Sequence, residues 1–328
     1  MLYDAEYLTR IEALVRAHLA EWELPPDAAL SLLSVSENAT FRITGGGRDM
    51  ALRVYRPGYH DAAEIRSELA WITALRDEEM VATPAPLATR DGRLLLEVRD
   101  TDASGTPRRM AAFAFVPGAE PQEGADLPFW FRRLGALHAR LHAHARRWTP
   151  PEGFSRKVWD FDAMLGARPL WGDFRAALGL GAAGRSLLER TALALKERLA
   201  PLSRPESFGL IHADLRLANL LADGDSLTLI DFDDCGFSWF LYDFAAAVSF
   251  MEHSPRVPEL KDAWMDGYRS LAPLPADAEV ALDVFVMLRR MLLTAWVASH
   301  AETPTAQAMG VPYTQGTLAL ADAFLSRG

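Results

Sequence analysis

The sequence predicts an α+β fold in two lobes: a small N-terminal lobe built on an antiparallel β-sheet and a larger, mostly helical C-terminal lobe. Short apolar runs bounded by turn residues fill the first part of the chain, whereas helical periodicity dominates the rest. A chain of 328 residues, 50% of them hydrophobic, can also form two cores. We place the lobes at residues 1–115 and 116–328, with a hinge near residues 114–121.

The N-terminal lobe begins with a helix, because apolar side chains recur at helical spacing over residues 7–18 until "PPD" ends the pattern. Three strands follow, "LSLLSVS", "TFRIT" and "MALRVYR", and the turns between them predict an antiparallel meander. A second helix is expected over residues 61–78. The turn in "ATRDGRLLLEV" then opens a hairpin whose partner strand is residues 108–116.

The C-terminal lobe reads as helical over residues 126–148, 185–200 and 258–327. One stretch differs, "IHADLRLANLLADGDSLTLIDFDD" at residues 211–234, which sets acids around two short apolar runs. The turn "DGDS" lets "LTLI" run back antiparallel to "NLL". The stretch is therefore expected to form a strand pair flanked by acidic loops.

Polar side chains gather at the ends of that strand pair. The turn brings Asp231 alongside Asn219, and a carboxylate with a carboxamide oxygen suits Mg²⁺, which takes its other ligands from phosphates and water. Asp214 precedes Asn219 in the same loop and could orient a hydroxyl and accept its proton. The alternative is that these residues only form loops closed by Asx turns.

These residues resemble the catalytic and metal loops of protein-kinase-like enzymes. His212, Asp214 and Asn219 fit H-x-D-x-x-x-x-N, and Asp231 fits the metal site that follows. More closely, "HADLRLANLL" with "IDFDDCGFSWFLYDFA" resembles the aminoglycoside phosphotransferase and choline kinase superfamily, including its homoserine-kinase-like and stress-response-kinase-like branches, across nearly the whole chain.

The resemblance implies a protein-kinase-like bilobal fold and transfer of a phosphoryl group from ATP, or alternatively GTP, to a hydroxyl group. It implies that Asp214 is the catalytic base, with His212 in the same loop, and that Asn219 and Asp231 bind Mg²⁺. Arg216 stands where relatives carry a cation directed at the transferred phosphate, although it could instead face solvent.

Arg53 departs from the family pattern, because relatives carry a lysine at this strand position to bind phosphates. A guanidinium can bind phosphate bidentately but is wider than an ammonium, so the phosphates shift to suit it or nucleotide binding is impaired. Glu68 falls within the apolar arc of the helix at 61–78, where an inward carboxylate needs a cation. We expect Arg53 to be that cation; the alternative is that Glu68 reaches solvent.

The loop that would cover the phosphates contains no glycine between residues 34 and 43. The backbone amides of Asn38, Ala39 and Thr40 could still face phosphates, because Asn tolerates left-handed turn geometry. A plain hairpin turn explains the same residues equally well.

The candidate acceptor pocket contains Asp233, Asp234 and Trp239, together with the helix around "RRMLLTAWVASH". Acids with Trp favour an amino alcohol or another cationic hydroxyl compound, through charge pairing and cation–π contact. Arg289 and Arg290 could instead recognise the carboxylate of a substrate, as in an amino-acid kinase, or they could extend along a helix flank to solvent.

Other polar residues are given structural roles. His138 and His142 have the i, i+4 spacing of a zinc pair, but they fall on the apolar stripe of their helix, and we interpret them as core residues. Asp243 is expected to brace the catalytic loop, and Cys235 has no evident base partner.

Composition narrows the partners and the compartment. A net charge of −10 with scattered acids disfavours nucleic acid. The N-terminal segment lacks the pattern of a signal peptide, no segment reads as membrane-spanning, and the single cysteine fits a reducing compartment, so we expect a cytoplasmic protein. Three functions stay open: a small-molecule O-phosphotransferase, a protein Ser/Thr kinase of the stress-response type, and a non-catalytic nucleotide-binding module.

Overall fold

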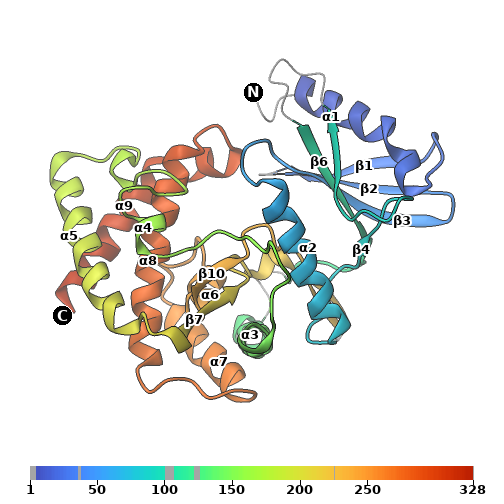
Figure 1. Ribbon diagram of the computed structural model, residues 1–328. Helices are drawn as coiled ribbons and strands as arrows, with labels where there is room; N and C mark the ends of the chain where they lie inside the picture. Colours follow the sequence, from blue (N-terminus) through green and yellow to red (C-terminus); the bar gives the residue numbers. More distant parts are fainter. Residues whose placement is uncertain (1–4, 36–37, 100–106, 122–125, 225, 328) are drawn as a thin grey trace. The chain divides into compact units, whose positions relative to one another are not determined.

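The computed structural model describes residues 5–35, 38–99, 107–121, 126–224 and 226–327 and divides them between two compact units (Figure 1). Unit 1 contains residues 1–119, 149–156 and 221–233, and unit 2 contains residues 120–148, 157–220 and 234–328. The chain therefore passes from one unit to the other several times, whereas the sequence predicted a single boundary after residue 115. Within the described residues, no helix is both long enough and apolar enough to span a membrane.

Unit 1 is built on a six-stranded sheet in the order β1-β2-β3-β6-β4, with β5 also paired to β6. All of these pairs are antiparallel. The strands are β1 (Ala29–Val35), β2 (Ala39–Gly45), β3 (Arg48–Val54), β4 (Pro86–Leu87), β5 (Leu96–Arg99) and β6 (Pro107–Ala114). The predicted meander and the pairing with residues 108–116 are confirmed.

The core of unit 1 lies between the sheet and the N-terminal helix α1 (Ala5–Ala17) (Figure 1). Alternate residues of β2, among them Phe41 and Ile43, are buried, as the two-residue period of a strand requires. Ile11 and Val15 of α1 are fully buried in the same cluster. The apolar face of α1 is therefore held by the sheet rather than by its own helical propensity.

Helix α2 (Ala62–Asp77) follows the meander and matches the predicted helix at 61–78. A capping box begins it: Asp61 accepts from the backbone of Glu64, and the Glu64 side chain accepts from the backbone of Asp61. Its buried face carries Ile65, Leu69 and Leu75.

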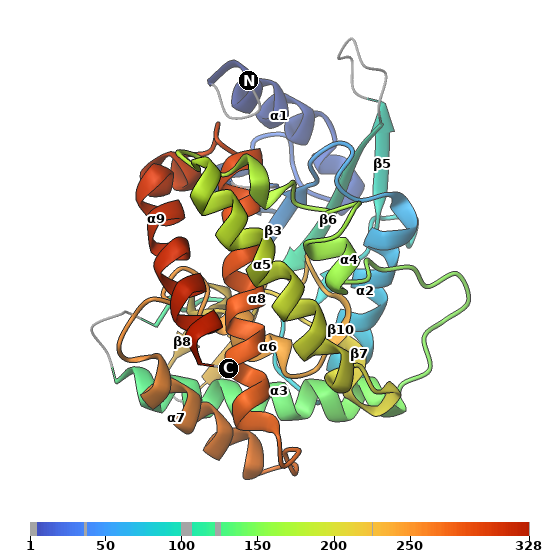
Figure 2. The ribbon, with the colours of Figure 1, turned by 90° about the vertical axis from the view of Figure 1, so that its left-hand side faces the viewer.

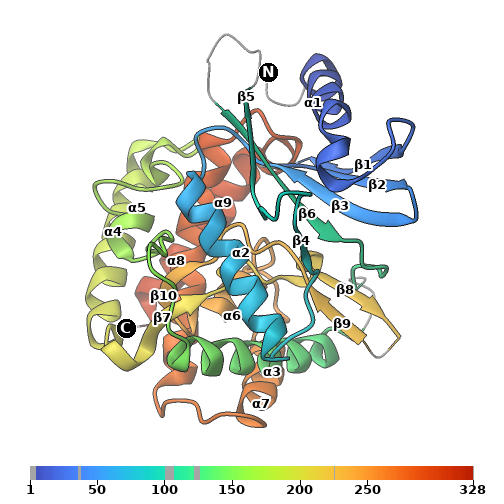
Figure 3. The ribbon, with the colours of Figure 1, turned by 45° about the vertical axis from the view of Figure 1, so that its right-hand side comes forward.

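A second pair of strands, β8 (Leu220–Asp223) and β9 (Ser226–Leu229), forms the predicted hairpin (Figure 3). Asp225 of its turn lies outside the described residues. Ala222 exchanges backbone hydrogen bonds with Ala119, at 2.9 and 3.0 Å, and Leu229 N–H donates to the Ala82 carbonyl at 2.8 Å. A two-stranded ribbon is marginal alone, so these bonds attach most of the hairpin to unit 1.

Unit 2 is mostly helical. Its main elements are α3 (Leu127–Arg147), α4 (Phe161–Met164), α5 (Ala182–Leu199), β7 (Phe208–Ile211), β10 (Gly236–Trp239), α6 (Tyr242–Ala247), α7 (Val257–Arg269), α8 (Ala278–Ser299) and α9 (Pro304–Ser326). β7 pairs antiparallel with β10, a strand that sequence reasoning did not expect. Helices α5, α8 and α9 lie side by side (Figure 2).

Two glycines allow α3 and α7 to pack closely. A Cβ atom at Gly135 would lie 2.0 Å from the Trp264 carbonyl oxygen, and one at Gly267 would lie 1.8 Å from that of Arg132. The Trp264 indole donates to Nδ1 of the buried His138 at 2.9 Å. His138 is thus part of the packing between these helices.

Candidate active site

The loop between β7 and the 3₁₀ turn Leu217–Asn219 is closed around Asp214. The Asn219 side-chain amide donates to the Asp214 backbone carbonyl at 2.8 Å and to Oδ2 of its carboxylate at 3.1 Å. Nε of Arg216 lies 3.4 Å from the same Oδ2. The fully buried His212 accepts from the Asp214 backbone N–H at 3.4 Å. The other three loop residues predicted from the sequence, His212, Arg216 and Asn219, therefore each contact Asp214.

Arg289 on α8 holds the other carboxylate oxygen of Asp214, Oδ1, at 2.6 Å from its Nη2. Its remaining donors reach the Ser249 hydroxyl, the Ala213 carbonyl and the Tyr242 hydroxyl. Burial would lower the pKa of Arg289, but Tyr242 and Asp214 raise that pKa above its ordinary value. The guanidinium therefore stays charged beside Asp214.

The alternative that Arg289 and Arg290 extend to solvent is wrong, because each is only 2% exposed. Arg290 instead pairs with the buried Glu252 at 3.0 Å. Sequence reasoning missed Arg289 as a partner of Asp214. The sequence feature that could have predicted this partner is a pair of arginines within a helix that is apolar on every side, because charges buried in such a helix need partners.

Asp243 accepts a hydrogen bond from the backbone just before Asp214, as predicted from the sequence. Ala213 has φ of +66°, a strained geometry for a residue with a side chain, and its N–H donates to Oδ1 of Asp243 at 2.8 Å. The other oxygen of Asp243 lies 3.0 Å from Nε2 of His142. Burial would raise the pKa of Asp243, but the neighbouring His138 and His142 lower that pKa to about 2. The Asp243 carboxylate therefore stays charged.

In unit 1, Arg53 is bonded to two carboxylates. Its Nη1 donates to Oε1 of Glu68 and its Nη2 to Oδ1 of Asp231, both at 2.9 Å. Glu68 is fully buried and also accepts from the Tyr55 hydroxyl at 3.3 Å. The predicted Arg53–Glu68 pair is confirmed, and the alternative that Glu68 reaches solvent is wrong.

A cavity of about 360 Å³ in unit 1 borders Arg53. Its charged lining residues are Arg53, Glu68 and Asp231, and Ser34, Thr40 and Thr83 add hydroxyl groups. The other walls are largely apolar, from Ala51, Ile72, Phe113, Phe115, Leu221 and Ile230. An apolar pocket with a few convergent polar groups is the usual form of a small-molecule site.

Asn38 and Ala39 do not line that cavity, unlike Thr40. The Asn38 side chain accepts from the Arg56 backbone N–H at 3.0 Å, and Ala39 is buried opposite Val54 in the sheet. Residues 36 and 37 of the same loop lie outside the described residues. A phosphate-binding role for the backbone amides stays a prediction.

Asn219 of unit 2 and Asp231 of unit 1 are the residues predicted to bind a metal ion. Because Asn219 directs its amide nitrogen at Asp214, its carbonyl oxygen points elsewhere. The side chain of Asp231, which carries a carboxylate, is 41% exposed. No three His, Cys, Asp or Glu side chains in the described parts of the chain are grouped to hold a metal ion. Carboxylate and amide oxygens are ligands that Mg²⁺ accepts, and Mg²⁺ binding by Asn219 and Asp231 stays a prediction.

Comparison with known proteins identifies the family. Residues 30–281 match the model of the phosphotransferase enzyme family. The chain belongs to that family. A protein of Deinococcus radiodurans is 32% identical over 87% of this chain and 81% of its own length. Amicoumacin kinase of Bacillus subtilis is 22% identical over 80% of this chain and 77% of its own length.

A solved structure of the microcompartment-associated aminopropanol kinase is 43% identical, with a TM-score of 0.89 over 96% of this chain and 98% of that one. The predicted kinase-like α+β fold is confirmed by this likeness. The present chain is therefore a small-molecule phosphotransferase.

Of the predicted acceptor residues of this phosphotransferase, Asp233 and Trp239 are buried and bonded within the protein. Asp233 lies 3.6 Å from His60, and Arg156 donates to its carbonyl. The Trp239 indole donates to Ser203 at 3.1 Å. The half-buried Asp234 offers its carbonyl to the Trp159 indole, at 2.9 Å. Substrate binding by Asp233, Asp234 and Trp239 stays a prediction.

Aromatic rings adjoin the two arginines that contact Asp214. The Arg216 guanidinium lies 5.6 Å from the ring centre of Phe250, and that of Arg289 lies 5.2 Å from Trp171. Phe250 packs against Trp296, with 6.2 Å between ring centres. Phe250 has φ of +71°, a strained value of the kind that clusters at functional sites. Trp296 lies within the "RRMLLTAWVASH" segment that sequence reasoning singled out.

Proposed function

We propose that this phosphotransferase moves the γ-phosphoryl group of ATP to a hydroxyl of a small amino alcohol, with Mg²⁺ and with Asp214 as the catalytic base. One observation carries the proposal: both carboxylate oxygens of Asp214 are engaged by positioned donors, Arg289 on one and Asn219 on the other. The 43% identity to aminopropanol kinase supports the choice of acceptor class.

Asp214 would orient the acceptor hydroxyl and take its proton as the oxygen attacks phosphorus. Its donors fix the carboxylate in one rotamer, which supplies the alignment that such a transfer needs. Arg216 contacts the same carboxylate and carries a charge that can stabilise the transferred phosphoryl group. His212, buried beside the loop backbone, positions Asp214.

The nucleotide is assigned to the cavity in unit 1, whose apolar walls suit a purine ring and whose polar part offers Arg53 to phosphates. We assign Mg²⁺ to side-chain oxygens of Asn219 and Asp231 on their place in the family pattern. An ion held by these two residues would supply positive charge to the phosphates during transfer.

The amine of the acceptor is assigned to the aromatic rings near Asp214. Phe250 packs against Trp296, and Phe250 and Trp171 also lie against the guanidinium groups of Arg216 and Arg289. A quaternary or primary ammonium is held well by the faces of such rings. Asp234, half-buried in unit 2, can add a negative charge for the same amine. A hydroxyl on the neighbouring carbons would then be presented to Asp214.

An ADP-release assay with purified protein tests the proposal. The acceptors are aminopropanol, ethanolamine, choline, homoserine, an aminoglycoside and a generic protein substrate, each with ATP and Mg²⁺. We expect amino alcohols to raise ADP release most and Asp214→Asn to lower the rate by at least about a hundredfold, the usual scale of a general base. Stimulation by the protein substrate alone would favour the stress-response type of kinase, and an unchanged rate in Asp214→Asn would refute the assigned base.

A further inference from the structure

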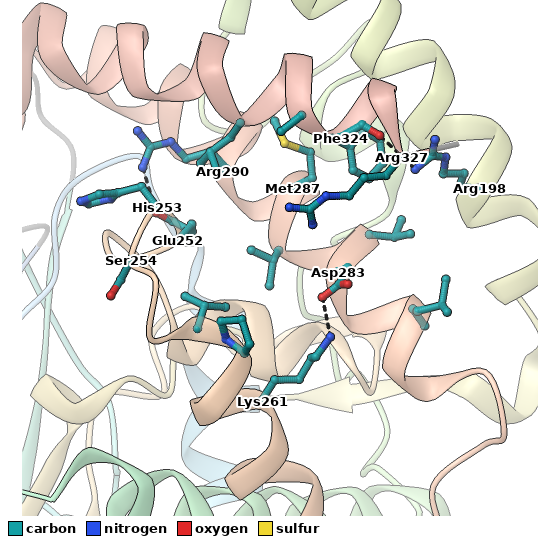
Figure 4. A pocket seen from close by; sticks show the side chains of 18 of the residues that line it. Arg198, Glu252, His253, Ser254, Lys261, Asp283, Met287, Arg290, Phe324 and Arg327 are labelled. Carbon is teal, nitrogen blue, oxygen red and sulfur yellow. Dashed lines mark hydrogen bonds and ion pairs between the residues drawn. The ribbon is translucent and has the colours of Figure 1, made fainter.

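Unit 2 contains a second cavity, of about 850 Å³, within the size range of small-molecule sites (Figure 4). Its walls come from the ends of α5 and α9, from α7 and α8, and from residues 252–258. Neither Asp214 nor Arg216 nor Arg289 lines it, and Trp171 and Trp296 do not line it either. The cavity is therefore separate from the catalytic loop and its aromatic neighbours.

The acids on the walls of this cavity are already neutralised. All three lie in ion pairs: Glu252 with Arg290 at 3.0 Å, Asp283 with Lys261 at 2.8 Å, and Asp277 with Arg204 at 3.4 Å. Figure 4 shows the first two pairs, in each of which one partner, Arg290 or Asp283, belongs to α8. These acids leave little negative charge to attract a cationic ligand.

Two wall arginines, Arg198 and Arg327, have no carboxylate partner among the residues that the structure describes. Arg198 lies over the Phe324 ring, with 4.2 Å between guanidinium and ring centre, and its Nη1 reaches the Phe324 carbonyl at 3.5 Å. Arg327 follows Phe324 on the next turn of chain, and Figure 4 shows both guanidinium groups near that ring. The unbalanced charge of the cavity is therefore positive, in a protein whose net charge is −10.

Apolar side chains border the two arginines. Met287, Leu320 and Ala323 line the cavity beside Phe324, and Val284 continues this wall along α8. A ligand that fills the cavity must therefore present an acid to the guanidinium groups and hydrocarbon to the wall. A fully polar anion would leave that wall without a partner.

We propose that this cavity binds a small organic anion, a carboxylate or phosphate monoester with a short aliphatic body. Arg198 and Arg327 hold the acid through charge-assisted hydrogen bonds, and the wall of Met287, Leu320 and Phe324 packs on the body. Guanidinium groups suit both acids, because each offers two oxygens to their paired N–H groups.

Isothermal titration calorimetry with four probes tests the site: hexanoate, hexyl phosphate, inorganic phosphate and hexylamine. We expect both organic anions to bind. The one that binds more tightly shows whether the site prefers a carboxylate or a phosphate. Inorganic phosphate should bind at least tenfold more weakly than hexyl phosphate, since it lacks the body. Any heat from hexylamine should be the same in the wild type and in a variant that lacks the two arginines, because an ammonium belongs at the acceptor site. Hexylamine binding that depends on the two arginines, or no heat with either organic anion at millimolar concentration, overturns the proposal.

Matched variants locate the binding. Arg198→Gln combined with Arg327→Gln should weaken the organic anions by about ten- to a hundredfold, the usual effect of losing charge-assisted contacts. Arg185→Gln removes an exposed arginine from the same helix outside the cavity and should change nothing. Ala323→Trp, which fills the apolar wall, should also weaken binding.

Asp214→Asn should bind the anions as the wild type does, which separates this site from the proposed catalytic one. Unchanged affinity in the double arginine variant would show that the anion binds elsewhere.

Discussion

Unit 1 and unit 2 each place an arginine against a carboxylate, but the two arginines face different charge balances. Arg53 lies within 4 Å of three acids, Glu68, Asp231 and Asp233, at 2.9, 2.9 and 3.8 Å. Arg289 lies on one, Asp214, and completes its bonds with neutral oxygens.

The difference indicates different tasks. Among the acids around Arg53, Asp233 also faces His60 and Arg156, whereas the side chain of Asp231 is 41% exposed. The Asp231 carboxylate is therefore open to a metal ion that arrives with phosphates. The pair of Arg289 with Asp214 is nearly closed to solvent, with the arginine side chain 3% exposed. We infer that Arg289 holds a catalytic group in place, whereas Arg53 is available to exchange partners.

The largest effect is expected from removing Arg289. Arg289→Met leaves Asp214 without its buried cation, which should cost about 3 kcal/mol of unfolding free energy and at least a tenfold loss in kcat. Urea unfolding and steady-state kinetics measure the two quantities. Arg290→Met is the matched control, because it breaks the buried pair with Glu252 and should lose similar stability while keeping kcat. Equal losses of kcat in both variants would contradict the positioning role.

The next effect concerns Arg53 as a phosphate ligand. Since Glu68 and Asp231 bind separate nitrogens of its fork, Arg53→Lys should weaken ATP·Mg²⁺ binding by about 1.5 to 3 kcal/mol, or roughly ten- to a hundredfold. Glu68→Gln should show a similar loss that is not additive with it. Calorimetric titration of both single variants and the double variant measures these losses. Tighter binding by Arg53→Lys would refute the interpretation.

A smaller effect should distinguish the acceptor site from the nucleotide site. Trp296→Leu keeps an apolar side chain but removes a ring face, so the KM for an amino alcohol should rise about two- to thirtyfold. The KM for ATP should stay constant, because Trp296 belongs to unit 2 and does not line the cavity beside Arg53. Initial rates at varied concentrations of each substrate distinguish the two. A rise in the KM for ATP alone would remove Trp296 from the acceptor site.

The smallest effect is a pH dependence near Arg53. Burial would lower the pKa of His60, but hydrogen bonds to Asp233 and Glu64 raise that pKa above its ordinary value of 6.5. The charged histidine therefore stabilises the fold fully below pH 6.5, and this contribution is lost as the pH rises through the raised value. The urea midpoint should fall more steeply above neutral pH in the wild type than in His60→Gln. Parallel pH profiles would show that His60 contributes nothing.

Local patterns in the sequence determined much of unit 1 and the position of the proposed catalytic loop. Alternating apolar residues and turn signals predict the three-stranded meander, since burial on one face of a strand follows a period of two. The spacing of Asp214, Asn219 and Asp231 led to the phosphotransferase family, and helical periodicity turned Glu68 inward toward Arg53. Each of these inferences depends on neighbours along the chain or on a motif with known spacing.

Only the tertiary structure decided which distant side chains meet. Arg289 is 75 residues from Asp214, and its apolar helix alone left open whether it was buried or exposed. The strand β10 is four residues long, too short for a clear period, and is recognised by its pairing with β7. Arg198 and Arg327 come to one cavity wall because α5 packs on α9. Contacts between distant segments depend on the packing of whole elements, which no local period specifies.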